Sequence, residues 1–368
     1  MTDSSSGPGS GDRVLVTGGA GFVGSSVVRA LLERGCDVAA LVEPAGDTAN
    51  LDGLDVEIVS GDLRDAAAVG RAVSGSRTVF HVAALYRFWA PDPSSFYDIN
   101  VTGTRNVLDA AGTHGVERLV YTSTVGTLGL GGATTDAPVD ERSFAHVDHL
   151  FGLYKQSKYV AEHEVLRATA EGLPVVLVQP TTPVGPRDRG PTPTGRTVLE
   201  FLDGRIPGYV DTTLNIVDVE DVAAGHLLAA DRGRVGRSYI LGGENLALRD
   251  VLATLAAVTG LPAPTRRFPA ALALAAGHVS GLVGVDCCTA SRRSPWRGRR
   301  CQPPTCPSTT REPARSWGTR HVRPPPRSSG RPGGSWRRGA CAPSGWPAVR
   351  GLAEVPPARR LRSARCRP

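Results

Sequence analysis

The chain has 368 residues, of which 40% are hydrophobic, enough for one large or two modest domains with a full core. No segment is typical of a membrane span, and the first residues, rich in Ser and Gly, lack the basic and apolar regions of a signal peptide. These features exclude an integral membrane protein. They predict a cytoplasmic protein whose residues 1–11 are disordered.

The net charge of +7 combines two unlike regions. Residues 287–368 contain 19 Arg, no Lys and two acids, whereas residues 1–286 carry a net charge of −10. Cysteine divides in the same way, since Cys36 is the only one in the first region and six lie in the second. None of them forms a CxxC pair, so the sequence predicts no metal site.

Residues 14–24, VLVTGGAGFVG, predict a strand, a tight glycine turn and the start of a helix that runs to residue 34. Gly18 permits the sharp turn, Gly21 lets a pyrophosphate approach main-chain N–H groups, and Gly24 lets the helix pack on the strand. The phosphates would lie at the positive end of that helix. Because this turn opens a βαβ pattern, it predicts dinucleotide binding.

The next predicted strand, residues 37–42, ends at Glu43, at the distance from the glycine turn where an acid binds the adenosine ribose hydroxyls. The same carboxylate would repel a 2′-phosphate, so the sequence favours NAD over NADP. An exposed loop glutamate is the alternative interpretation. A third predicted strand, residues 56–59, leads to Asp62, which is placed to approach the adenine.

Strands and helices continue to alternate as far as residue 178. The fourth predicted strand, residues 78–83, ends in Ala83 and Ala84, which leave room for the nicotinamide-side ribose, and it contains His81 as a predicted core histidine. Further helices are predicted at 97–115 and 150–171, and further strands at 119–122 and 175–178. The alternation predicts an α/β fold with a doubly wound parallel sheet.

Residues 86–91 place Tyr86, Phe88 and Trp89 in a loop beyond a strand end, the side on which such sheets bind ligands. This aromatic loop could line a substrate pocket or serve packing alone, and the sequence does not separate the two.

Tyr154 and Lys158 lie four residues apart and therefore share one helix face. A tyrosine with a pKa of about 10 is a poor acid–base catalyst at neutral pH, and a nearby cation stabilises its phenolate. Lys155 and Lys158 are the only lysines in the chain. Thr124, at a strand end, could hydrogen-bond the substrate oxygen.

With these motifs the sequence resembles the extended short-chain dehydrogenase/reductase superfamily, the NAD-dependent epimerase/dehydratases, over residues 12–285. Within it the chain is most similar to the hopanoid-associated sugar epimerases, which are related to dihydroflavonol 4-reductases. The matching segments are residues 17–24, 61–63, 81–84, 100–106, 121–124, 154–158, 179–188 and 215–222, with 86–93, 191–196 and 239–245 for the closer likeness.

The resemblance implies that Tyr154 is the general acid/base and that Lys158 binds the nicotinamide ribose and tunes the tyrosine. It also implies that Thr124 holds the reacting oxygen and that Asn100 supports the proton relay. The reductase relatives usually have Arg in place of Glu43, and the usual serine is Thr124 here, with Ser123 beside it as the alternative. The predicted cofactor-binding residues are Gly18, Gly21, Phe22, Val23, Gly24, Glu43, Asp62, Leu63, Ala83, Lys158 and Pro180.

Residues 12–182 are predicted to form the NAD-binding Rossmann domain, with residues 212–232 packing back on it. Residues 183–286 would form a smaller α/β substrate domain. The candidate substrate-binding residues are Tyr86, Arg187 and Arg196, with Thr192 a candidate by position alone.

Residues 287–368 are rich in Arg, Pro, Ser, Gly, Cys and Trp and show no periodicity, which predicts a non-globular tail. We interpret this composition as the product of a reading-frame shift in a GC-rich gene near codon 286, which would leave the substrate domain incomplete. The 368-residue intact mass of the native protein would contradict that interpretation. The alternative is a basic arm that binds nucleic acid with a steep salt dependence, which we do not expect to be the main role.

The sequence therefore predicts an NAD-dependent oxidoreductase or epimerase that acts on a secondary alcohol or ketone of a small sugar-like or terpenoid-linked molecule. A ketone reductase without epimerisation is the alternative within the superfamily. A non-catalytic NAD-binding protein is the alternative from another class, although it need not keep Tyr154 and Lys158. The sequence leaves a homodimer open as the assembly.

Overall fold

The computed structural model of the chain describes residues 7–87, 89–128, 139–143, 145, 150 and 152–269. The chain divides into two units, residues 1–292 and 293–368, and every described residue belongs to the first. The predicted tail, residues 287–368, lies outside the described residues, as do residues 1–6 and Phe88 of the aromatic loop.

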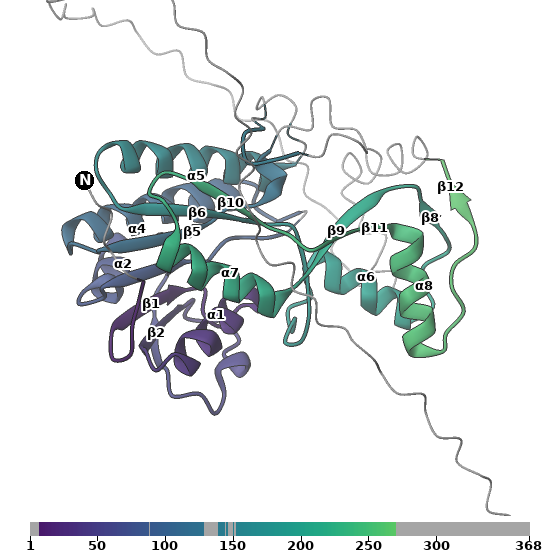
Figure 1. The fold of residues 1–368 in the computed structure, drawn as a ribbon, viewed down its shortest axis with the longest axis horizontal. Helices are drawn as coiled ribbons and strands as arrows, with labels where there is room; N and C mark the ends of the chain where they lie inside the picture. Colours follow the sequence, from purple (N-terminus) through teal and green to yellow (C-terminus); the bar gives the residue numbers. More distant parts are fainter. Residues whose placement is uncertain are drawn as a thin grey trace, which may run out of the picture. The chain divides into compact units, whose positions relative to one another are not determined.

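The larger sheet has seven strands, all parallel, in the order β10-β6-β5-β4-β1-β2-β3 (Figure 1). Helices connect most of these strands, whereas the connection from β2 to β3 contains only a short 3₁₀ turn, Ala49–Leu51. This arrangement confirms the predicted doubly wound parallel sheet. The strands are β1 Arg13–Thr17, β2 Asp37–Val42, β3 Glu57–Ser60, β4 Thr78–His81, β5 Arg118–Thr122, β6 Val175–Pro180 and β10 Ser238–Leu241.

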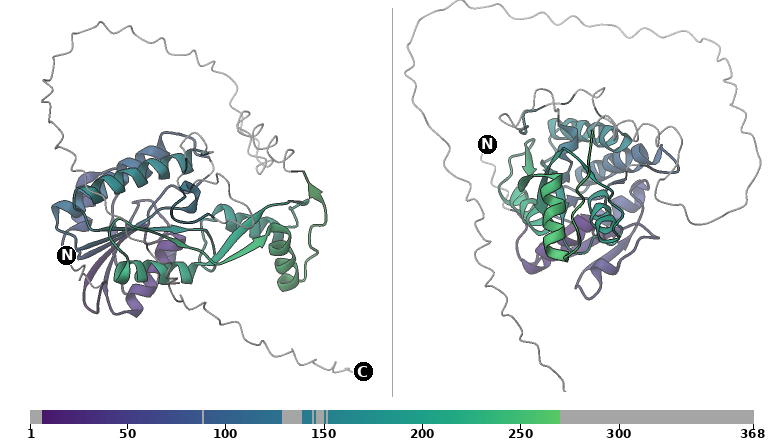
Figure 2. Two further views of the ribbon diagram at one scale, coloured as in Figure 1. Left: turned by 45° about the horizontal axis from the view of Figure 1, so that its top comes forward. Right: turned by 90° about the vertical axis from the view of Figure 1, so that its right-hand side faces the viewer.

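Helices cover both faces of this sheet, and Figures 1 and 2 show the two helical layers from three directions. Helices α1 (Phe22–Glu33) and α7 (Val219–Arg232) pack together on one face. Helices α2 (Ala66–Val73), α4 (Gly103–Thr113) and α5 (Leu153–Ala170) form the other layer.

The two layers enclose two hydrophobic clusters, one on each side of the sheet. Successive residues of β1 alternate between them, because Leu15 belongs to the cluster with α2, α4 and α5, whereas Val14 and Val16 belong to the cluster with α1 and α7. A strand buried on both faces reads as a continuous apolar run, which explains the strong sequence signal of β1.

The helix predicted over residues 97–115 is composite. It consists of α3 (Ser95–Tyr97), a π-helical turn over Asp98–Thr102 and α4, which ends at Thr113. Gly115 has a φ of +65°, the left-handed conformation that commonly follows a helix end. A π-helical turn has no distinct residue pattern, so the prediction merged the three pieces.

Apart from α7 and β10, the described residues beyond β6 form the smaller part of the molecule. Its three-stranded sheet has the order β11-β9-β7, and β8 pairs with β12. These elements are β7 Thr182–Val184, α6 Pro193–Leu202, β8 Tyr209–Val210, β9 Thr213–Asp218, β11 Glu244–Ala247, α8 Leu248–Thr259 and β12 Arg267–Phe268.

The chain returns to the larger sheet over a longer stretch than residues 212–232. After α7, residues 238–241 form β10 and pair in parallel with β6, so assigning them to the smaller domain was wrong. All four residues of this edge strand are only partly buried, and β10 therefore lacks the apolar run of the central strands.

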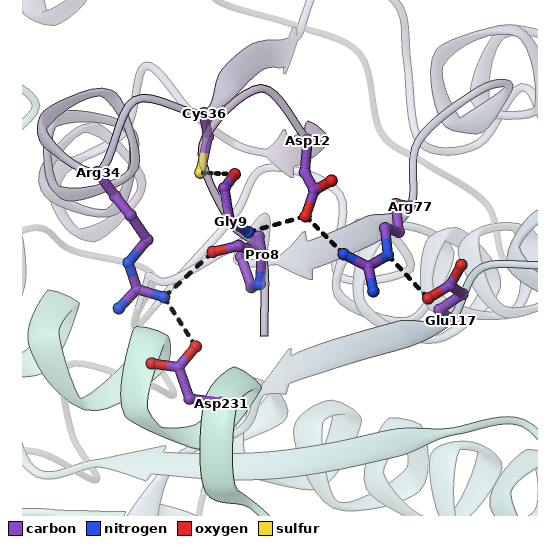
Figure 3. A network of polar contacts seen from close by, with 8 residues as sticks. All are labelled: Pro8, Gly9, Asp12, Arg34, Cys36, Arg77, Glu117 and Asp231. Carbon is purple, nitrogen blue, oxygen red and sulfur yellow. Dashed lines mark hydrogen bonds and ion pairs between the residues drawn. The ribbon is translucent and has the colours of Figure 1, made fainter. Parts of the chain in front are cut away.

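The prediction that residues 1–11 are disordered is wrong for residues 7–11, which take part in a polar network (Figure 3). The Gly9 N–H donates to Asp12 Oδ2 at 2.8 Å. The Arg34 guanidinium donates to the Pro8 carbonyl at 3.4 Å and pairs with Asp231 of α7 at 2.7 Å. A Ser/Gly-rich segment becomes ordered here because the side chains of nearby Asp12 and of the more distant Arg34 satisfy its backbone groups.

Among the described helices, none combines the length and the apolar character that crossing a membrane requires.

Candidate active site

A cavity with a volume of about 510 Å³ lies at the carboxyl ends of the strands of the larger sheet. Residues directly after β1, β2, β4 and β5 line it, including Gly18, Glu43 and Thr124. Residues after β6 also line it, namely Thr181, Pro183, Asp188, Arg189, Gly190, Thr192 and Thr194. This is the side of a parallel sheet on which nucleotides bind.

The glycine turn between β1 and α1 brings the cavity wall close to β4. Gly18 has a φ of +67°, and a Cβ there would lie 2.8 Å from the Ala83 Cα. A Cβ on Gly24 would overlap the Gly18 carbonyl oxygen. Only glycine therefore permits this approach of helix, turn and strand.

The N-terminus of α1 faces the cavity, since Gly21, Phe22 and Val23 line it. No side chain caps this helix end and its first turn contains no acidic residue. The first N–H groups and the positive end of the helix are thus directed at the cavity, as the diphosphate of a dinucleotide requires.

A buried histidine fixes the turn to β4 and α4. His81 is 1% exposed, its Nδ1 lies 2.7 Å from the Thr17 hydroxyl and its Nε2 lies 2.9 Å from the Thr104 hydroxyl. Burial lowers the pKa of His81 to about 3, so the ring is neutral. Because Thr104 donates to the Asn100 carbonyl, the proton of His81 must lie on Nε2 and Nδ1 must accept from Thr17.

Glu43 and Asp62 both line the cavity, as predicted for its adenosine side. The Asp62 carboxylate accepts hydrogen bonds from Arg64, the shortest at 2.5 Å, and this contact lowers the Asp62 pKa. The hydrogen bond with Asp62 raises the Arg64 pKa, and the nearby Glu43 carboxylate adds a smaller contribution. The Asp62 carboxylate is therefore already hydrogen-bonded to Arg64, whereas the Glu43 carboxylate is exposed to solvent.

Tyr154, in the first turn of α5, lies beside the aromatic loop. Its ring centroid is 4.7 Å from that of Tyr86, at an interplanar angle of 49°. Burial raises the Tyr154 pKa well above its ordinary value, Tyr86 adds to the effect, and a hydrogen bond with Thr124 opposes it. The structure thus brings Tyr154 and Thr124 together and holds the phenol in its protonated form.

Lys158 lies one turn further along α5 and is 2% exposed. Its Nζ donates to the Thr122 carbonyl at 2.7 Å and lies 4.4 Å from the centroid of the Tyr121 ring. Burial lowers the Lys158 pKa to about 7, and the Glu162 carboxylate opposes this shift. The sequence predicted that Lys158 lowers the Tyr154 pKa, but the burial of both groups dominates in the structure.

Ser123 and Thr124 point to different partners. The Ser123 hydroxyl donates to Glu162 Oε2 at 2.5 Å, and the Thr127 hydroxyl donates to the same oxygen at 3.0 Å. Glu162 was not predicted, although it follows Lys158 by four residues and so lies on the same helix face. The engagement of Ser123 leaves Thr124 as the hydroxyl that faces the phenol.

Asn100 is 1% exposed and is not among the residues that line the cavity. Its Nδ2 donates to the Ser157 hydroxyl at 2.9 Å and its Oδ1 accepts from the Leu85 N–H at 2.7 Å. The side chain therefore joins α5 to the aromatic loop from behind the cavity wall.

All the predicted cofactor-binding residues line the cavity, together with Thr124, Tyr154 and Tyr86. Arg187 and Arg196 do not line it, and Arg187 instead pairs with Glu220 at 3.1 Å. The lining residues that the sequence did not indicate include Asp47, Asn50, Asp188, Arg189 and Thr194.

Within the part of the chain that the structure describes, no three His, Cys, Asp or Glu side chains are grouped so as to hold a metal ion.

The chain is similar to proteins of one known family. The profile of the NAD dependent epimerase/dehydratase family matches residues 14–242. A Synechocystis protein that carries the name dihydroflavonol 4-reductase is 48% identical over 276 residues, which are 74% of this chain and 80% of the relative. Sterol demethylase protein B of Methylococcus capsulatus is 37% identical, over 69% and 77% of the two chains.

Among solved structures, the UDP-glucose 4-epimerase of Thermus thermophilus in complex with NAD superposes with a TM-score of 0.60 and 31% sequence identity. The superposition covers 70% of this chain and 86% of that one.

Proposed function

Because the chain belongs to the NAD-dependent epimerase/dehydratase family and is therefore an NAD(P)-dependent oxidoreductase, we propose that it interconverts a secondary alcohol and a ketone with Tyr154 as the acid/base. The observation that supports this proposal is the partly buried Tyr154 phenol, hydrogen-bonded with Thr124 in the wall of the cavity that begins at the glycine turn.

The cofactor supplies or accepts hydride at nicotinamide C4. In the direction of reduction, the Tyr154 hydroxyl would give its proton to the carbonyl oxygen of the substrate as a bound reduced cofactor supplied hydride to the carbonyl carbon. In the direction of oxidation, Tyr154 would take the proton of the alcohol and an oxidised cofactor would accept the hydride. Thr124 would hold the reacting oxygen next to Tyr154, and the high Tyr154 pKa favours the proton-donating form.

Lys158 is proposed to bind the nicotinamide ribose. Its pKa of about 7 places both charge states within reach at neutral pH. A hydrogen bond from Lys158 to a ribose hydroxyl would take the place of, or add to, the bond to the Thr122 carbonyl. The cationic form would then favour the phenolate of Tyr154 when a proton must be removed.

We propose NAD rather than NADP as the cofactor. Glu43 is exposed at the cavity and close to Arg64, but Arg64 donates to Asp62 through both Nε and Nη2. A 2′-phosphate entering beside Glu43 would meet a carboxylate, whereas ribose hydroxyls could donate hydrogen bonds to it.

For the substrate we propose a small sugar-like or terpenoid-linked molecule with Tyr86 as part of the wall. The 40% exposed Tyr86 ring beside Tyr154 offers a flat apolar surface to a ring-shaped substrate. The relatives are named dihydroflavonol 4-reductase, sterol demethylase protein B and UDP-glucose 4-epimerase, so epimerase and reductase outcomes are both candidates.

Purification followed by denaturation tests the proposal, with the released nucleotide identified by mass spectrometry. We expect NAD(H), and its retention through gel filtration would favour an epimerase. Stoichiometric NADH consumption with one member of a panel of sterol, flavonoid and sugar ketones would favour a reductase. A folded protein that binds neither NADH nor NADPH at millimolar concentration would refute the proposal.

A further inference from the structure

Residues 185–192, which follow β7, lie against the glycine turn although more than 160 residues separate the two segments. Asn50, 6% exposed, connects them, because its Nδ2 donates to the carbonyl oxygens of Ala20 and Arg187, both at 3.0 Å. The smaller part of the molecule therefore contributes a loop directly beside the expected diphosphate position.

This loop has an unusual backbone. Arg187 has a φ of +73°, the only positive φ of a non-glycine residue within the described ranges. A bulky residue rarely adopts this conformation, and here the Asn50 contact and the ion pair with Glu220 maintain it. The conformation sets the direction of the chain into Asp188 and Arg189.

Arg189 and Asp47 both line the cavity, and their side chains form an ion pair. The Arg189 Nε lies 3.0 Å from Asp47 Oδ2, and the two side chains are 56% and 60% exposed. An ion pair this exposed is weak, since water screens it. A guanidinium binds a phosphate more strongly, through parallel charge-assisted hydrogen bonds.

The other cations that line the cavity are Lys158 and Arg87, and neither belongs to the loop that Asn50 joins to the glycine turn. Lys158 donates to the Thr122 carbonyl next to Tyr154, and Arg87 follows Tyr86, whose ring lies beside Tyr154. The α1 N-terminus offers main-chain N–H groups from one side only. Arg189 thus brings a cation to the glycine turn from the smaller part of the molecule.

We propose that Arg189 is a cofactor-binding residue that takes the dinucleotide diphosphate from the side opposite α1, and that Asp47 competes with the diphosphate for its guanidinium. The inference rests on the proposed function only in requiring a nicotinamide dinucleotide. It assigns opposite roles to the two partners of one ion pair.

These opposite roles predict opposite mutant phenotypes. Arg189→Ala should weaken NADH binding about tenfold, through faster dissociation, because a charge-assisted phosphate contact is lost. Asp47→Asn should tighten NADH binding about two- to threefold, because the competitor is lost while the side-chain oxygen that accepts from the Ala49 N–H is kept. In the Arg189→Ala background, Asp47→Asn should have no effect.

The experiment is a double-mutant cycle on the full chain, with NADH fluorescence titrations and stopped-flow dissociation at several NaCl concentrations. ADP, which carries the same diphosphate, is titrated as a competitor and should lose affinity to the same extent. Arg205→Ala is the matched control, since Arg205 is an exposed arginine paired with Asp203 in the same part of the molecule and does not line the cavity.

Three results would overturn the inference. NADH affinity of Arg189→Ala within twofold of wild type excludes the contact. Equal weakening of NADH affinity by both single substitutions would show that the ion pair only stabilises the conformation of the loop. Equal tightening by Asp47→Asn in both backgrounds would show that Asp47 repels the cofactor without involving Arg189. Failure of the wild-type protein to bind NADH or NADPH would instead refute the proposed function.

Discussion

Two groups of residues line the cavity and differ in their surroundings. The inner group, Thr122, Thr124, Tyr154 and Lys158, contacts buried backbone and aromatic rings, and burial shifts the pKa values of Tyr154 and Lys158 in opposite directions. The charged rim, Glu43, Asp47, Asp62 and Arg189, lies at the other strand ends and is more exposed.

The contrast indicates which group controls which property. A buried polar group that loses its partner costs about 1–3 kcal/mol, whereas an exposed ion pair contributes about 0–1 kcal/mol. Substitutions in the inner group should therefore change turnover or stability strongly. Substitutions in the rim should change cofactor affinity and selectivity moderately and leave the fold intact.

The largest effect is expected for Tyr154→Phe, which removes the proton-donating hydroxyl and keeps the ring that packs on Tyr86. We expect turnover of the substrate found in the ketone panel to fall roughly 10²- to 10⁴-fold. NADH affinity, measured by fluorescence, should stay within twofold. Turnover that survives this substitution would remove the distinction between the two groups.

The next largest effect on turnover should distinguish the adjacent hydroxyls of Thr124 and Ser123. Thr124→Val should lower turnover about 10- to 100-fold, because its hydroxyl is hydrogen-bonded with Tyr154. Ser123→Ala should change turnover by less than about threefold, since Ser123 donates to Glu162 instead. Steady-state rates of both variants decide between them, and the reverse order would assign the catalytic role to Ser123.

The lowered pKa of Lys158 predicts that the free energy of unfolding depends on pH. Below pH 7 the lysine is protonated in the folded and unfolded states, so the full cost of burying its charge is present. Above pH 7 the folded state releases the proton before the unfolded chain does, and the free energy of unfolding should rise by up to about 1.4 kcal/mol per pH unit.

Urea denaturation between pH 7 and 9.5 measures this rise. Lys158→Met should abolish it, because the substituted side chain does not titrate. Lys155→Met is the matched control on the same helix, since Lys155 is exposed and should keep the wild-type pH dependence. An unchanged rise in Lys158→Met would assign it to another group.

The sequence predicted the central sheet and most of the inner group because short-range patterns encode them. The run from Arg13 to Thr17 and the glycines at 18, 21 and 24 report a strand and a turn within a dozen residues. Tyr154 and Lys158 likewise share a helix face through their spacing alone. The alternation of strands and helices then fixes on which edge of the sheet they meet.

Contacts between distant segments could not be predicted in this way. Nothing near Asn50 in the sequence indicates that it reaches the carbonyl of Arg187, and Asp47 and Arg189 are separated by 142 residues. Arg187 shows the same limit, since its position in the sequence suggested a pocket residue, but its side chain pairs with Glu220 and does not line the cavity. Such contacts depend on how the smaller part returns to the sheet.

The smallest expected effect concerns cofactor selectivity at the charged rim. Glu43→Gln removes a negative charge but keeps a side chain able to accept hydrogen bonds from ribose hydroxyls. A charge interaction across solvent contributes about 1 kcal/mol, so the preference for NADH over NADPH should fall roughly fivefold. The two dissociation constants, measured by fluorescence, give this ratio directly.

Asp55→Asn is the control, because Asp55 is an exposed acid outside the cavity, and it should leave the ratio unchanged. A Glu43→Gln variant with the wild-type ratio would mean that the exposed rim does not select the cofactor, and selectivity would then have to reside in buried contacts.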